Sequence, residues 1–287
     1  MNICCFPFFN EIDIVEVKLA TLKPVIDLFV ICEIDITFSG KERELLWPKL
    51  SKEIPFLSLM RGQIVYLPLE ISKLSSRPKF TSAWDVEAYT RNALANGFEA
   101  RDKDTVVFLT DADEVPDPYW IIKSSRKIRE QPSRIERPLM ARHCYYVNWR
   151  SNDLSRHEQM TCGFSAHNLS GRTMESICRK SDFTHVSLPH GIGWHFGWMG
   201  GAEKMKNKLS SFAHTELATK KNLSYKHINN CLSTGKDLFG RDHLDAINIM
   251  DWDLPSYLVK NKKKFLHLWS PEARVIEGRY EHSHASF

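Results

Sequence analysis

One apolar segment that ends in three acids constrains the fold more than any other feature of this chain. Residues 105–110 read TVVFLT, and Asp111, Asp113 and Glu114 follow directly. A short run of apolar and β-branched residues is typical of a strand covered on both faces, as the strands of parallel sheets are. Because ligands bind at the carboxyl ends of strands in α/β sheets, we expect a binding site at these acids.

Strand and helix patterns alternate before this segment. Strands are expected at 3–9, 28–32 and 64–67, and helices at 12–22 and 84–95. Asn10 is the expected cap of the first helix, and Gly97 is expected to end the second. This alternation predicts an α/β fold with a mostly parallel central sheet flanked by helices.

The pattern changes in the second part of the chain, which is richer in aromatic residues. Strands are expected at 139–149 and 162–166, and helices at 200–217 and 225–232. Neither a repeat nor a long linker divides the chain, and its length suits one large α/β domain. We therefore predict a single domain, 1–287, in which residues 1–136 bind a nucleotide and residues 137–287 shape the substrate site.

The composition argues against several other classes of protein. The net charge is +4, with no basic run longer than Lys262 to Lys264, so no nucleic-acid partner is expected. No apolar stretch reaches the ~18 residues of a membrane span, and acids already occur by residues 11–16, so we expect neither a transmembrane segment nor a signal peptide, and a cytoplasmic location. The seven cysteines include no C-x-x-C pair, which favours buried free thiols in a reducing compartment.

The acids after the strand predict a metal site. Clustered carboxylates repel one another and need a compensating cation. Mn²⁺ or Mg²⁺ binds carboxylate oxygens, bridges a diphosphate and stabilises a departing nucleoside diphosphate. The alternative is a polar turn that caps a helix beginning near Pro116 and Pro118. A second D-x-D, Asp251-Trp252-Asp253, follows no buried strand and is expected to be structural.

Residues 191–201, GIGWHFGWMGG, form the second candidate segment. Glycines allow a ligand to approach the backbone closely. Trp194 and Trp198 offer flat faces for a sugar, and His195 is placed to complete a metal shell. The alternative for His195 is a packed core residue in a tight turn.

A third candidate is the helix over 84–95. Trp84, Glu87 and Arg91 share one of its faces. Glu87 and Arg91 form either a simple pair on the helix surface or part of a site in which Arg91 holds a phosphate.

Together these segments resemble glycosyltransferase family 17, from about residue 3 to about residue 270. The matching segments are Phe8–Asp13, Phe29–Glu33, Thr37–Lys41, Trp84–Asn92, Asp111–Pro116, Gly193–Phe196, Lys208–Glu216 and Gly235–Arg241. Each segment is modest evidence, but their order and spacing are specific. The chain is most similar to short, soluble members of the family.

The resemblance implies a GT-A-like fold and the inverting transfer of a sugar from a UDP-sugar to a glycan acceptor. N-acetylglucosamine from UDP-N-acetylglucosamine is the expected donor group, and Mn²⁺ or Mg²⁺ the expected cofactor. Residues 1–136 would bind the nucleotide sugar, and residues 137–287 would complete the metal site and bind the acceptor.

Roles for single residues follow from that resemblance. Asp113 is expected to bind the metal directly and to be catalytic; Asp111 would bind the donor ribose or assist at the metal. His195 would be the metal ligand from the second half, with His214 in reserve. The remaining donor-binding candidates are Asn10, Glu11 and Glu33 for the nucleoside and Arg91, Lys208 and Arg241 for the diphosphate. Trp194 and Trp198 would contact the acceptor.

An inverting transfer also needs a carboxylate that deprotonates the acceptor hydroxyl. Glu216 is the expected base, with Glu203 and Asp237 as alternatives. Two rival functions use the same residues. One is a metal-dependent hydrolase acting on a sugar or phosphate substrate, and the other is a sugar-binding module without turnover.

Overall fold

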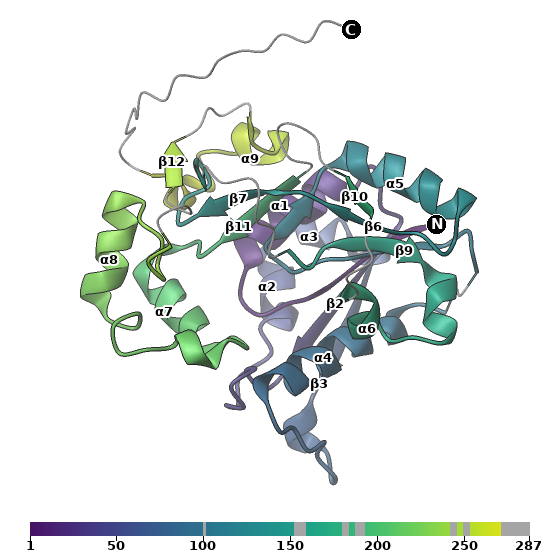
Figure 1. The fold of residues 1–287 in the computed structure, drawn as a ribbon, viewed down its shortest axis with the longest axis horizontal. Coiled ribbons are helices and arrows are strands. Elements are labelled where there is room, and N and C mark those ends of the chain that lie inside the picture. The colour runs from purple at the N-terminus through teal and green to yellow at the C-terminus, as the bar shows by residue number, and fades with distance from the viewer. Residues whose placement is uncertain are drawn as a thin grey trace, which may run out of the picture.

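The computed structural model of the chain describes residues 1–99, 102–151, 159–179, 184–186, 193–241, 246–248 and 253–270. Two sheets and their flanking helices make up this part of the chain (Figure 1). The larger sheet contains, in spatial order, β10 (Thr184–Val186), β6 (Ile135–Pro138), β9 (Cys162–Ser165), β4 (Val106–Leu109), β1 (Asn2–Pro7), β2 (Leu28–Ile34) and β3 (Ile64–Leu69).

The four strands β4, β1, β2 and β3 are parallel neighbours, with Ile3 opposite Leu28 and Val107. β9 pairs antiparallel with β4 and with β6. All four residues of β4 are buried, as the apolar sequence of this strand predicted. The expected α/β fold with a mostly parallel central sheet is therefore confirmed.

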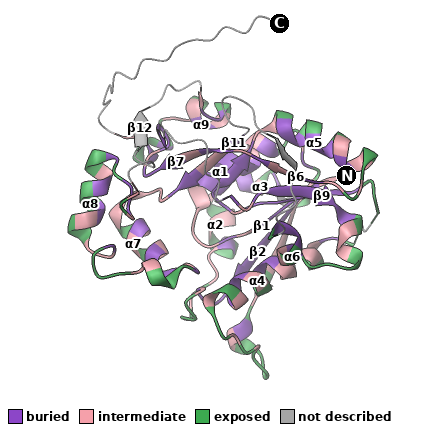
Figure 2. Ribbon diagram, in the orientation of Figure 1, coloured by how far each residue is buried: buried purple, intermediate pink, exposed green. Residues whose placement is uncertain are grey.

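Helices cover both faces of this sheet. Because successive side chains of a strand point to opposite faces, the core consists of two clusters, one on each face. Cys4, Phe6 and Phe108 pack against α1 (Ile12–Leu22), α2 (Trp47–Glu53), α3 (Pro55–Ser58) and α5 (Pro118–Glu130). Ile3, Cys5 and Val107 point to the other face, toward the end of α4 (Ala83–Ala93) and α6 (Met174–Cys178). Figure 2 shows the buried strands between helices whose outer sides are exposed.

The smaller sheet comes mostly from the second part of the chain. Its strands are, in spatial order, β12 (Ala246–Asn248), β8 (Trp149–Ser151), β7 (Ala141–Cys144), β11 (Gly193–Gly197) and β5 (Glu114–Pro116). Helices α7 (Gly201–Ser211), α8 (Tyr225–Thr234) and α9 (Ser256–Lys260) accompany it. β5 follows β4 directly, so the acids lie where the chain passes from one sheet to the other.

Several predicted boundaries were wrong for local reasons. Asn10 does not cap α1; the cap position is Glu11, whose carboxylate accepts the backbone N–H groups of Phe9 and Asn10. The predicted strand over 139–149 is two strands, because Tyr145 adopts a positive φ of 70° between them. α7 ends at Ser211 rather than at 217, since Phe212 is extended.

Two other predictions, the end of α8 and the state of the cysteines, hold. α8 ends where expected, with Gly235 in the left-handed conformation. All seven cysteines are free and buried. Within the described ranges, no helix is both long and apolar enough to cross a bilayer. Asp251, Trp252 and the first two residues of the segment 191–201 lie outside the described residues.

Candidate functional site

Residues 110–114, here called the acid loop, connect β4 to β5. The Thr110 N–H extends the β1–β4 ladder by donating to the Cys5 carbonyl. At the other end of the loop, the Asp113 carbonyl accepts a 2.8 Å hydrogen bond from the Phe196 N–H of β11. The loop is thus held between the larger sheet on one side and β11 of the smaller sheet on the other.

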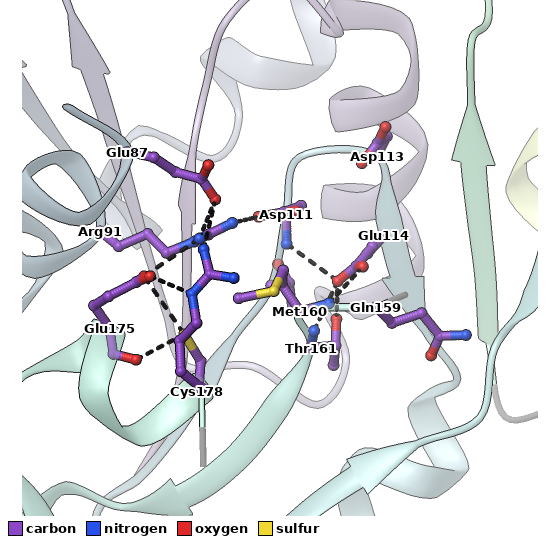
Figure 3. Close-up of polar contacts among 12 residues, drawn as sticks. Glu87, Arg91, Asp111, Asp113, Glu114, Gln159, Met160, Thr161, Glu175 and Cys178 are labelled. Carbon is purple, nitrogen blue, oxygen red and sulfur yellow. Dashed lines mark hydrogen bonds and ion pairs between the residues drawn. The ribbon is translucent and has the colours of Figure 1, made fainter. Parts of the chain in front are cut away.

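The third acid of the loop, Glu114, is a structural anchor. It is 1% exposed, and its carboxylate accepts the backbone N–H groups of Met160 and Thr161, each at 2.8 Å, and the Thr161 hydroxyl at 2.6 Å (Figure 3). It also accepts the Asp111 N–H at 3.3 Å. Burial raises the pKa of Glu114, and the negative charge of Asp111 adds to that rise. Its oxygens are occupied, so it contributes rigidity to the loop.

A buried lysine that the sequence analysis missed supports the loop from below. Lys18 of α1 is fully buried, and its Nζ donates to the Thr110 hydroxyl at 2.5 Å and to the Asp111 carbonyl at 2.6 Å. The ammonium also lies 4.2 Å from the centre of the Phe6 ring. Burial lowers the pKa of Lys18. The signal was available, because Lys18 lies on the apolar face of α1, four residues after Ile14 and four before Leu22.

Asp113 lies between two cationic or basic side chains. It is 6% exposed; its Oδ2 accepts from Lys208 Nζ at 2.6 Å, and its Oδ1 lies 3.8 Å from His195 Nε2. Lys208 also lies 3.7 Å from Glu11. Burial alone would raise the pKa of Asp113, but Lys208 and His195 outweigh it and lower the pKa to about 2. Asp113 is therefore a carboxylate at neutral pH.

The side chain of Asp111 turns in a different direction. Its Oδ1 accepts from Arg91 at 2.9 Å. Arg91 is 3% exposed and also pairs with Glu87 and, at 3.3 Å, with Glu175. Figure 3 shows this network around Arg91, with Asp113 pointing away from it. Arg91 is thus neither a surface pair with Glu87 nor an exposed phosphate ligand, and it fixes Asp111 in place.

These acids do not cap α5. That role belongs to Asp117, whose side chain accepts the Tyr119 N–H at 2.7 Å. The interpretation of the acid loop as a helix-capping turn was therefore wrong. Instead, Asp111 pairs with Arg91 of α4. Asp113 contacts Lys208 of α7 and lies close to His195 of β11.

A pocket adjoins the Asp113 side of the loop. Its walls come from the start of α1, from β11 and from α7. It is lined by Asn10, Glu11, Asp13, Ile14, Phe196, Trp198, Met199, Lys204, Met205, Lys208 and Leu268. The structure thus brings the predicted donor-binding residues Asn10, Glu11 and Lys208 together beside Asp113. Lys204 adds a second ammonium one helical turn before Lys208.

The family model of glycosyltransferase family 17 matches residues 4–273, nearly the whole chain. The protein belongs to glycosyltransferase family 17. It is therefore a glycosyltransferase with an α/β fold, as the resemblance of its sequence segments implied. No curated protein sequence matches this family 17 chain.

Three solved structures are similar to this chain at low identity. S. aureus TarS 1-349 is 11% identical, with 81% of this chain and 72% of that chain covered and a TM-score of 0.40. An active-site mutant of LgtC is 11% identical, with 61% of each chain covered and a TM-score of 0.30. The 2-C-methyl-D-erythritol 4-phosphate cytidylyltransferase of Francisella tularensis is 11% identical, with 58% and 74% covered and a TM-score of 0.32. Such distant likenesses carry no argument about substrates.

Besides Arg91, two further donor-binding assignments in this family 17 protein need correction. Glu33 is fully buried, and its carboxylate accepts from Arg43, Tyr66 and two backbone N–H groups, so it has no free oxygen for a nucleoside. Arg241 pairs with Asp237 through two nitrogens, each at 3.0 Å, away from the contacts that surround Asp113. These partners commit both side chains to the fold.

The two tryptophans expected to bind the acceptor are half-buried, and both pack against hydrophobic clusters. Alternation along β11 places Trp194 and Phe196 on one face, in a hydrophobic cluster, and His195 on the other, toward Asp113. The Trp194 indole N–H donates to the Asp253 carbonyl at 2.6 Å. Trp198 has a positive φ of 62° and contacts Phe212 and Phe239 edge-on. Trp198 still reaches the pocket wall, but Trp194 does not line it.

The candidate bases differ sharply in their surroundings. The Glu216 side chain is 62% exposed, and a 2.7 Å hydrogen bond from His214 lowers its pKa. Asp237 is buried and held by Arg142 and Arg241, so it is a structural acid. Glu203 accepts from the Tyr225 hydroxyl. Glu216 and Glu203 are thus both exposed, unlike Asp237, and His214, the partner of Glu216, is engaged away from Asp113.

The residues that fit a metal ion are few. Among the residues that the structure describes, no group of three His, Cys, Asp or Glu side chains is arranged to hold an ion. Asp113 and His195 provide two suitable ligands close together, whereas Asp111 is committed to Arg91. The Asp113 carboxylate suits an ion such as Mg²⁺ or Mn²⁺ that takes its other ligands from phosphate oxygens and water, and the His195 imidazole suits a transition-metal ion.

Proposed function

We propose that this family 17 protein is an inverting, metal-dependent glycosyltransferase that transfers N-acetylglucosamine from UDP-N-acetylglucosamine to a hydroxyl of a glycan acceptor. The donor would bind in the pocket beside Asp113. The observation that carries this proposal is the environment of Asp113: a buried carboxylate, at the end of a central strand, that contacts Lys208 and faces His195 beside a pocket with a second lysine.

The charges around the pocket suit a nucleoside diphosphate. Lys204 and Lys208 extend from one face of α7, and their partners in the protein are Asp13 and Glu11 with Asp113. Phosphate oxygens compete well for such ammonium groups because they carry more charge than a single carboxylate. Lys204 and Lys208 are therefore proposed to bind the diphosphate, and Asn10 and Glu11 to contact the nucleoside.

Asp113 and His195 would hold the divalent ion in this proposal. When bound, such an ion supplies a Lewis acid that stabilises the diphosphate as it leaves. The protein keeps Asp113 ionised and fixes its direction through the Phe196 N–H and Lys208. Lys18 and Glu114 hold the backbone of the loop, so little reorganisation is needed when the donor binds.

Glu216 is the proposed base that accepts the proton of the acceptor hydroxyl. Like any exposed glutamate it is ionised at neutral pH, and the His214 hydrogen bond lowers its pKa further. The exposed position leaves it open to a bulky acceptor. Inversion follows if the hydroxyl attacks from the side opposite the departing diphosphate, with Glu216 on that side.

The test measures UDP release from UDP-N-acetylglucosamine with Mn²⁺, with and without a mixture of oligosaccharide acceptors. Transfer requires release that depends on an acceptor and a new glycoside whose anomeric configuration is opposite to that of the donor. Asp113→Asn should lower transfer by at least ~10²-fold, as loss of a strong electrostatic group does. Asp117→Asn, which keeps a capping side chain at α5, is the matched control and should retain activity.

The rival functions give different results in the same assay. A hydrolase would release sugar or phosphate at the same rate without an acceptor. A sugar-binding module would give no turnover and would bind glycans equally well after Asp113→Asn.

A further inference from the structure

A second pocket lies beside the acid loop, on the side of Asp111. It is lined by Trp84, Asp85, Ala88, Glu175 and Arg179. Trp84 is in the first turn of α4 and is 37% exposed, although large aromatic side chains are usually buried. The Arg179 guanidinium lies 5.1 Å from the centre of the Trp84 ring. An exposed aromatic surface with polar neighbours needs an explanation.

The pocket is joined to Asp111 through one arginine. Arg91 lies two turns after Trp84 on α4 and pairs with Glu175 of the pocket wall as well as with Asp111. Glu175 in turn pairs with Arg179 at 2.6 Å. The two aspartates of the loop therefore face two different pockets, Asp113 toward the proposed donor site and Asp111 toward the Trp84 pocket.

The segment after α7 also connects the two pockets. Lys208 of α7 lies in the proposed donor site, and six residues later the His214 ring contacts Trp84 edge-on at 4.6 Å. His214 bonds Glu216, the proposed base. A ligand against Trp84 would thus lie next to the carboxylate that is to accept its proton.

The polar groups of the wall already have partners in the protein. Arg179 pairs with Glu175 and Glu87, and the Asp85 carboxylate accepts from Thr81 and Ser82 in the capping box of α4. With the two acids Asp85 and Glu175 and the one base Arg179, the wall has no excess positive charge for a phosphate or another anionic ligand. It offers an aromatic surface for C–H groups and paired polar side chains for hydroxyl groups, which together match a pyranose ring.

We propose that the Trp84 pocket binds a neutral sugar unit of the acceptor glycan. The inference rests on the proposed function, because it is the acceptor site of that same transferase. It replaces Trp194 and Trp198, which pack in hydrophobic clusters, as the acceptor-binding residues.

The experiment compares wild type, Trp84→Ala, Trp84→Phe and the control Tyr119→Ala, which removes a 57% exposed aromatic ring from α5. UDP affinity with Mg²⁺ is measured by calorimetry. Binding of a mixture of methyl α-mannoside, methyl β-galactoside and methyl N-acetyl-β-glucosaminide is measured by saturation-transfer NMR with UDP and Mg²⁺ present. Melting temperatures establish that each variant is folded.

The expected result is that Trp84→Ala weakens glycoside binding about tenfold, a typical effect of losing an aromatic contact, and leaves UDP affinity unchanged. Trp84→Phe should retain most of the binding, and Tyr119→Ala all of it. Unchanged glycoside binding in folded Trp84→Ala, or no glycoside binding to wild type, overturns the proposal. Weaker UDP binding in Trp84→Ala also overturns it, since the pocket would then hold the nucleoside.

These outcomes are separate from failure of the proposed function. Wild type that binds no UDP contradicts the transferase mechanism, whatever the glycosides do. Glycoside binding that depends on Trp84 without UDP binding would instead describe a sugar-binding module.

Discussion

At the scale of residues, the two aspartates of the D-x-D differ through their partners. Asp113 faces an ammonium and an imidazole and keeps an ionised carboxylate at low pH, whereas Asp111 is locked by a buried guanidinium. Both acids of the motif are aspartates, so the motif itself does not predict the direction in which each side chain points. We propose that Asp113 binds the ion and faces the diphosphate, and that Asp111 fixes the geometry of the loop. This difference arises because α4 brings Arg91 to Asp111 and α7 brings Lys208 to Asp113.

The lowered pKa of Asp113 predicts an acid-sensitive contribution to stability. The pKa falls from the usual 3.8 to about 2 in the folded protein, so the stabilisation is complete above pH 3.8 and is lost as pH falls toward 2. Between pH 5 and pH 3, metal-free wild type should lose about 1 kcal/mol of unfolding free energy that Asp113→Asn does not lose. Urea denaturation at both pH values in EDTA measures this. Equal losses would mean that Lys208 does not stabilise the ionised form.

His195 provides a second test at this scale. Its loss should weaken Mn²⁺ binding in the presence of UDP by at least about tenfold, because an ion ligand is removed while the fold of β11 is kept. His195→Asn is measured by Mn²⁺ titration with electron paramagnetic resonance. His167→Asn, at an exposed position outside the pocket, is the control. Unchanged Mn²⁺ affinity in folded His195→Asn would remove His195 from the ion site.

At the scale of elements, the strong patterns were predictable and the local exceptions were not. The strand over 105–110 was found because its residues are apolar and β-branched throughout, and the helix predicted over 84–95 is α4, which ends two residues earlier, at Ala93. The break at Tyr145 was missed because a positive φ at an aromatic residue has no sequence signal. The core position of Trp194 depends on which face of β11 meets α9 and its neighbours, and pairing between distant strands decides that.

The contact between α1 and the end of β4 leads to a prediction for Lys18. Lys18→Met removes a buried ammonium whose two hydrogen-bond acceptors are neutral oxygens, so stability should stay the same or rise. Turnover should fall about tenfold, because the Asp111 carbonyl loses its anchor and the loop moves. Chemical denaturation and the UDP-release assay measure the two effects.

The matched control for Lys18 is Lys264→Met, which removes the partner of the buried Glu16 on the same helix. It should lose stability and keep turnover, the opposite pattern. A parallel loss of stability and turnover in Lys18→Met would make Lys18 an ordinary part of the core.

At the scale of the whole molecule, function depends on how two sheets meet. The larger sheet supplies the rigid end of β4, and the smaller sheet and α7 bring His195 and Lys208 to it (Figure 1). The sequence analysis located the acids and the histidine because both follow recognisable segments. It did not find the Trp84 pocket, because Glu175 and Arg179 reach Trp84 from a helix more than eighty residues away.

The contacts that β11 and α7 make with Asp113, just after β4, predict how ligands stabilise the folded protein. Lys208 already occupies one oxygen of Asp113, so Mn²⁺ alone should raise the melting temperature little. UDP with Mn²⁺ should raise it by roughly 5–10 °C at about 100 times the dissociation constant, since that concentration adds ~2.7 kcal/mol of stability. EDTA should abolish most of this rise and all sugar transfer.

Lys208→Met should let Mn²⁺ alone stabilise the protein more strongly, because Asp113 is released, but should weaken UDP binding. Differential scanning calorimetry with each ligand separately and together measures these shifts. An equal rise with UDP in EDTA would show that Lys208 and Lys204 suffice for the diphosphate and that the ion has no part in donor binding.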